Sequence, residues 1–208
     1  MPSLQDLPEN YAAALRLIDE AHAEDPRTAA GEDGGTIPYE LHYAHKMTRW
    51  LAARCPDASP ALQLACRAQH FRRWEIPRSS YPMTRPGYLT WRTKQKAQAA
   101  AQVAELLRSS PSIAPAIPAE DIDRVAALIR KENLRSDEDA QALEDTACLV
   151  FLDDQFDDFE SKDEIDEDKI IGILRKTWAK MSAPGRDLAL GMQHSERAQS
   201  LIGKALAG

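Results

Sequence analysis

The chain has 208 residues, of which 43% are hydrophobic and 28% charged, and its formal net charge is −7. This length suits one domain with its own core, and the negative charge argues against a general nucleic-acid-binding protein. No apolar run approaches the length of a membrane span, and the N-terminus lacks the pattern of a signal peptide. The three cysteines are widely spaced and form no CxxC pair. We therefore expect a cytoplasmic protein without a zinc site or a disulfide framework.

Apolar residues at helical spacing recur along the chain, and no segment shows the alternation of a β-strand. The expected helices cover residues 7–23, 38–55, 60–74, 87–108, 119–131, 137–159, 163–181 and 184–206. A Gly-rich loop at 30–36 and a Pro-rich loop at 76–86 separate some of them. Ser59 followed by Pro60 is a typical helix start. The sequence therefore predicts an all-α fold in a single domain.

Charge is strongly segregated along the chain. Residues 67–96 hold eight Lys or Arg and one acid, whereas residues 137–168 hold fifteen Asp or Glu and one Lys. The two segments could face each other and offset their charges. Alternatively, the basic residues could line an anion site into which Glu144 and Asp145 point.

The stretch AQHFRRWEIPRSSYP, Ala68 to Pro82, combines a histidine with three arginines and two prolines. Guanidinium groups match phosphates and carboxylates bidentately, and prolines hold a loop in one shape. The alternative is that the arginines pair with the acidic helix around Glu144. The predicted substrate-binding residues are Arg72, Arg73, Arg78 and Arg92.

Three further features suggest a metal site. The segment YELHYAH places Glu40, His42 and His45 on a helix. His70 ends the apolar segment LQLACRAQH, and Glu144 with Asp145 heads the apolar segment LEDTACLVFL. Buried carboxylates are costly unless they are paired or bound to a metal. The alternatives are a His70 that bonds a backbone carbonyl or a carboxylate, and acids that serve as ion-pair and helix-dipole partners.

In this order, the segments resemble the HD-domain superfamily of metal-dependent phosphohydrolases over about residues 38–152. ALQLACRAQHF aligns with the apolar run before that family's His-Asp pair, and His70 falls on its His. VAALIRKENLRSDEDAQALEDTACL aligns with the region that leads to the family's last Asp, which falls on Asp145. The resemblance implies an HD-like helical core and a divalent metal ion held by Glu40, His70 and Asp145, with Glu144 as general base. The chain departs from the pattern at Phe71, which replaces the Asp of the pair, and at Glu40, which replaces the first His.

A second resemblance spans nearly the whole chain. It rests on the motifs IDEAHAEDP, YELHYAHKMTRWL, RAQHFRRWEIPRSSYPMTRPGYLTWR, QALEDTACLVFL and ILRKTWAKMS. These are similar to a family known as domain of unknown function 4202. That resemblance supplies no activity, so it bears on identity and leaves function to the residues.

The first hypothesis is a metal-dependent hydrolase that acts on a small phosphorylated or nucleotide-like substrate, with a divalent metal ion as cofactor. The alternative is a non-catalytic helical protein that binds a small anion or an acidic partner through the same residues. A third option, an iron-dependent oxygenase, would need the ligand that Phe71 replaces. Nucleic-acid binding is opposed by the net charge, and no oligomeric state is predicted.

Overall fold

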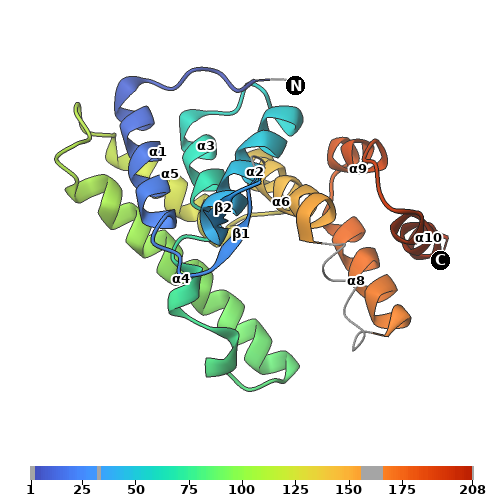
Figure 1. The fold of residues 1–208 in the computed structure, drawn as a ribbon. Helices are drawn as coiled ribbons and strands as arrows, with labels where there is room; N and C mark the ends of the chain where they lie inside the picture. The colour runs from blue at the N-terminus through green and yellow to red at the C-terminus, as the bar shows by residue number, and fades with distance from the viewer. Residues whose placement is uncertain (1–2, 32–33, 156–165, 208) are drawn as a thin grey trace.

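Helices make up most of the computed structural model, which describes residues 3–31, 34–155 and 166–207. The predicted all-α class is therefore confirmed (Figure 1). No described helix is both long enough and apolar enough to cross a membrane. The longer helices are α1 (Glu9–His22), α2 (Tyr39–Arg54), α3 (Pro60–Arg67), α4 (Arg85–Ser109), α5 (Ala119–Arg130), α6 (Glu138–Val150), α8 (Glu167–Lys180), α9 (Ala183–Leu190) and α10 (Glu196–Leu206).

A small hairpin precedes α2, so the prediction that the chain has no strands is wrong. Strands β1 (Thr28–Ala30) and β2 (Thr36–Pro38) pair antiparallel, with Ala29 opposite Ile37. Strands of three residues are too short to show an alternating pattern. The predicted Gly-rich loop at 30–36 overlaps the strands at Ala30 and Thr36, and its residues 32 and 33 lie outside the described residues. The hairpin ends at Pro38, the N-cap of α2, and so it fixes where the helix begins and places Glu40 in its first turn.

Several helices end where local chemistry, rather than hydrophobic pattern, stops them. The third helix was predicted to reach Trp74, but it ends at Arg67, and Arg72 adopts a left-handed conformation with φ 49°. The predicted helix 184–206 is split into α9 and α10, because Ser195 caps a new helix by accepting from the backbone N–H of Ala198. The predicted helix 137–159 changes at Phe151 into a π-helical turn, η3 (Phe151–Gln155), and its predicted end lies outside the described residues.

The buried residues form two hydrophobic clusters. The larger cluster is built from α1 to α6 and includes Ile18, Met47 and Leu64, whose side chains are fully buried. The smaller cluster joins the end of α6 to the C-terminal helices α8, α9 and α10. Figure 1 shows the C-terminal helices lying beside α6, away from α1 and α5. Each fully buried aliphatic side chain contributes roughly 1.5–3 kcal/mol to folding, so both clusters hold their helices in place.

Candidate functional site

A pocket of about 300 Å³ opens between α4, α6 and α8, beside the loop that carries His70. This volume suits a small metabolite. Among the described residues that line it, five are cationic and one is a carboxylate. The charged lining residues are Arg73, Arg92, Lys96, Lys131, Lys180 and Glu144.

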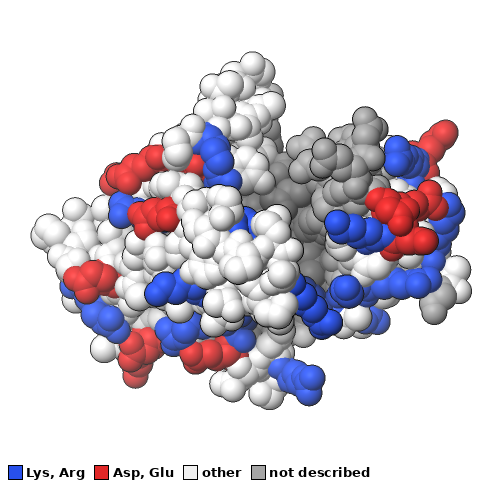
Figure 2. All heavy atoms as spheres, turned by 90° about the horizontal axis from the view of Figure 1, so that it is seen from below, with Lys and Arg blue, Asp and Glu red and all other residues white. Residues whose placement is uncertain are grey.

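The molecular surface reflects the same distribution of charge. Seen from below, Lys and Arg side chains lie on both sides of the junction between the larger helix group and the C-terminal helices (Figure 2). Asp and Glu side chains lie in groups over the left half of that view and at its right-hand end. Cations therefore flank this junction on the face that the view shows.

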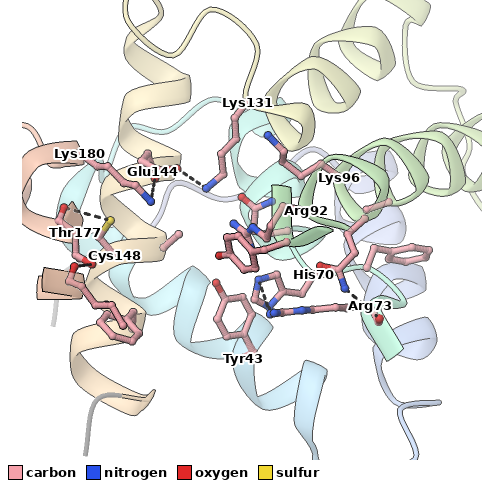
Figure 3. Close-up of a pocket in the computed structure, with 18 residues that line it drawn as sticks. Tyr43, His70, Arg73, Arg92, Lys96, Lys131, Glu144, Cys148, Thr177 and Lys180 are labelled. Atoms are coloured by element: carbon pink, nitrogen blue, oxygen red, sulfur yellow. Dashed lines mark hydrogen bonds and ion pairs between the residues drawn. The ribbon is translucent and has the colours of Figure 1, made fainter. Parts of the chain in front are cut away.

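The cations reach the pocket from separate elements. Arg92 and Lys96 are one turn apart on α4, so their side chains share a face of that helix. Lys131 follows α5 in a left-handed conformation, with φ 58°, which ends the helix. Lys180 is the last residue of α8. Figure 3 shows Lys131 and Lys180 converging on Glu144, whereas Arg73 lies beside His70.

Glu144 is the acid at the centre of the lysines. Its Oε2 lies 2.5 Å from Lys131 Nζ and its Oε1 lies 3.7 Å from Lys180 Nζ. Burial opposes ionisation of this carboxyl, but Lys131, Lys180 and Arg92 outweigh burial and lower its pKa. A carboxylate with a lowered pKa is a weak base. The geometry therefore favours a role for Glu144 in holding the lysines over the predicted role of general base.

His70 is clamped on both faces of its ring. Tyr43 stacks on it with ring centroids 3.9 Å apart. Arg73 Nη1 lies 3.4 Å from Nδ1 and 3.3 Å from Nε2. An atom nearly equidistant from both nitrogens would collide with Cε1 if it lay in the ring plane. The Arg73 guanidinium therefore lies over the ring face that Tyr43 leaves open. Arg73 does not approach either ring nitrogen within the plane of the imidazole.

Glu40 lies behind this histidine. Its side chain is completely buried, and Arg27 bridges it to Asp25 through contacts of 2.7 and 2.8 Å. The other oxygen, Oε2, has no hydrogen-bond partner and lies 3.3 Å from His70 Nδ1. Burial raises the pKa of Glu40, although Arg73 and Arg27 act in the opposite direction.

The imidazole of His70 is neutral at physiological pH. Burial lowers its pKa well below the ordinary value, and the positive charges of Arg73 and Arg92 add to this effect. Its side chain retains 13% exposure, at the pocket wall. A neutral imidazole offers one donor N–H and one free lone pair.

Asp145 is not part of this arrangement. It is fully buried on α6 and accepts hydrogen bonds from Arg54 Nε at 2.7 Å, Gln141 Nε2 at 2.9 Å and the backbone N–H of Ser182 at 2.8 Å. These contacts join α2 and the start of α9 to α6, and they use both oxygens. Asp145 is an ion-pair and capping partner in this structure.

The predicted metal-ligand set is consequently separated. Glu40 and His70 are neighbours, but Asp145 lies elsewhere and does not line the pocket. Catalytic metal centres usually draw three ligands from the protein. Within residues 3–31, 34–155 and 166–207, no group of three or more His, Cys, Asp or Glu could hold a metal ion. The predicted three-ligand centre does not fit these residues.

The four predicted substrate-binding arginines are also divided. Arg73 and Arg92 line the pocket. Arg72 instead pairs with Glu24 at 3.0 Å. Arg78 donates to the carbonyls of Tyr81 and Pro82 at 2.9 and 2.8 Å, so it holds the Pro-rich loop together.

Three cations of the pocket were missed in the sequence. Lys96 could have been found, because it lies four residues after Arg92 on a predicted helix. Lys131 and Lys180 could not have been found in this way. Each lies at the end of a helix, and the direction of its side chain depends on how that helix packs. Tyr43, which stacks on His70, lies on the same helix as Glu40 but carries no signal of this contact.

The chain was compared with known proteins and families. The model of a family described as "Domain of unknown function (DUF4202)" matches residues 12–202. No curated protein and no solved structure matches the chain.

Proposed function

We propose that this chain, which belongs to the DUF4202 family, binds a small polyanionic, phosphorylated ligand in the pocket between α4, α6 and α8. The observation that carries the proposal is the excess of cations there: five line the pocket against one carboxylate, in a chain of net charge −7. Cations that repel one another in a partly buried space are costly without a counter-charge. A bound anion would supply it.

The lining also suggests the shape of the ligand. Arg73 and Arg92 lie near His70, whereas Lys131 and Lys180 lie at Glu144. The positive charge of Arg92 acts on both His70 and Glu144, so Arg92 lies within electrostatic range of both groups. This distribution favours a ligand with more than one anionic group, such as a diphosphate. Such anions form charge-assisted hydrogen bonds with guanidinium and ammonium groups.

The proposal is tested by titrating the protein with pyrophosphate in a calorimeter. Arg92→Ala should weaken binding about tenfold or more, because a hydrogen bond to a charged group contributes roughly 1.5–3 kcal/mol. Lys94→Ala is the matched control, since Lys94 is exposed on the same helix and does not line the pocket. Equal affinities of the two variants, or no binding by the unmodified protein, would contradict the proposal.

Metal-dependent hydrolysis of a phosphorylated or nucleotide-like substrate stays a prediction from the sequence. Of its predicted residues, Glu40 lies 3.3 Å from His70, and His70 and Glu144 line the same pocket. Elemental mass spectrometry of the purified protein and of His70→Ala tests it. Near-stoichiometric metal that is lost in the variant would support the prediction, and metal-free protein in both samples would oppose it.

A further inference from the structure

The imidazole ring of His70 is fixed by contacts on both faces and by a carboxylate near Nδ1, which a residue that only lined an anion site would not need. Tyr43 and Arg73 cover the two faces of its ring, and Glu40 Oε2, which has no hydrogen-bond partner, lies 3.3 Å from Nδ1. A carboxylate beside Nδ1 favours the tautomer in which Nδ1 carries the proton. The lone pair of the ring then lies on Nε2. The buried acid Glu40 thus lies behind a neutral histidine that lines the pocket together with a group of cations.

We propose that Nε2 of His70 accepts a phosphoryl group from a ligand bound in the pocket, so that a phosphohistidine forms. The donor would be an acyl phosphate or a phosphoanhydride. This inference rests on the proposed function, because the phosphoryl group must first bind among the cations.

The bonds of the step balance without a further reactant. The Nε2 lone pair forms the N–P bond, while the P–O bond to the leaving group breaks and its electrons depart on a carboxylate or a phosphate. Such leaving groups are stable anions at neutral pH and need no proton. Water would then attack phosphorus, the N–P electrons would return to Nε2, and inorganic phosphate would be released with transfer of a proton to solvent.

The surrounding residues suit this step. Arg73, at 3.3 Å from Nε2, lies where it can neutralise the oxygens of a phosphoryl group on that nitrogen, and Arg92 adds a second positive charge. Glu40 would stabilise the positive charge that develops on the ring by accepting from Nδ1–H. It acts through His70 and is a positioning residue.

Other potential nucleophiles in the pocket are less suited. Cys148 lines the pocket, but burial and the nearby Glu144 raise the pKa of its thiol to about 12. The thiolate is the reactive form, and little is present at neutral pH. Glu144 is engaged by Lys131 and Lys180. His70 is therefore the nucleophile that the geometry favours.

The experiment incubates the full chain with acetyl phosphate or with pyrophosphate, each with and without Mg²⁺. Intact-mass spectrometry at neutral pH should show the addition of one phosphoryl group. The modification should be lost in acid and retained in alkali, and peptide mapping should place it at His70. His70→Gln should abolish it, whereas the control His42→Gln should retain it, since His42 does not line the pocket. Glu40→Gln should slow the modification about tenfold or more.

A calorimetric titration of the same samples separates the two proposals. Pyrophosphate binding without any phosphoryl addition would overturn phosphoryl transfer and leave the anion site standing. Modification that persists in His70→Gln would also overturn it. Neither binding nor modification would overturn both proposals. The unmodified protein gives the first and third results by itself, so neither depends on a variant that folds.

Discussion

Gly185 lies directly against the carboxylate of Asp145. A Cβ added to Gly185 would stand 2.7 Å from Asp145 Cγ and 2.8 Å from its Oδ1. Asp145 also accepts from the backbone N–H of Ser182, which caps α9. The first turn of α9 is therefore seated on a buried carboxylate of α6, next to the end of α8, where Lys180 reaches the pocket.

Substituting Gly185 with alanine should lower the free energy of unfolding by roughly 1–3 kcal/mol, because the new methyl group must displace a fully hydrogen-bonded side chain. Gly172→Ala in α8 is the matched control, since a Cβ there meets nothing within 4 Å. That substitution should stabilise the protein by roughly 0.5–1 kcal/mol. Urea denaturation of both variants measures the difference. Equal stabilities would show that α9 adjusts without cost.

Removing Arg54 should be more damaging. Its Nε donates to Asp145 at 2.7 Å, and Asp145 is completely buried, so Arg54→Met leaves a buried charge without its partner. A loss of about 3–5 kcal/mol in the free energy of unfolding is expected. Arg108→Met is the control, because the Arg108–Asp123 pair is half-exposed or more and should contribute under about 1 kcal/mol. Similar losses for both variants would contradict the structural role of Asp145.

Stability should fall below about pH 6.5 in part because of His22. Burial lowers the pKa of this histidine from 6.5, although the Arg67 carbonyl and the carboxylates of Glu40 and Asp19 oppose the change. Below pH 6.5 the unfolded chain therefore binds a proton that the folded chain does not. The free energy of unfolding should drop by up to ~1.4 kcal/mol per pH unit.

The contribution of His22 is isolated by comparing how steeply the free energy of unfolding changes with pH in the variant and in the unmodified protein. The lowered pKa of His70 acts in the same direction, and the raised pKa of Glu40 acts in the opposite one. Urea denaturation at several pH values between 5 and 7.5 should therefore give a shallower pH dependence for His22→Gln than for the unmodified protein. Identical slopes would mean that His22 takes up its proton in the folded state too.

Substitution of Glu144 with glutamine should strengthen anion binding. The carboxylate now occupies Lys131 and Lys180, so it competes with a ligand for them. Glutamine keeps the shape but removes the charge, and pyrophosphate affinity should rise roughly tenfold, equivalent to ~1.4 kcal/mol. Calorimetry measures it. Weaker binding would instead mean that Glu144 is needed to order the lysines.

The sequence was a good guide where local pattern decides structure. Apolar spacing predicted most helices, and Ser59 caps α3 as expected, accepting from the backbone N–H of Leu62. The sequence did not predict the hairpin before α2, because strands of three residues leave no recognisable pattern. It also did not predict the left-handed conformation of Arg72, because arginine has no preference for that conformation.

The site was predictable in part for the same reason. His70, Arg73, Arg92 and Glu144 were found because their residue types are informative in themselves, and they do line one pocket. Which carboxylate lies beside His70 depends on tertiary packing. Glu40 does so because the hairpin fixes the start of α2, whereas Asp145 pairs with Arg54. Spacing along one chain cannot separate these outcomes.

The walls of the pocket belong to different hydrophobic clusters. α4 and Phe71 are part of the larger one, and α8 is part of the smaller one, which it shares with α10. A ligand that binds Arg92 and Lys180 at the same time would therefore link the larger hydrophobic cluster to the smaller one. By thermodynamic linkage, its occupancy and the local opening of the C-terminal helices form one equilibrium. Amide hydrogens of α10, which contributes nothing to the pocket, should then exchange more slowly with solvent once pyrophosphate is bound.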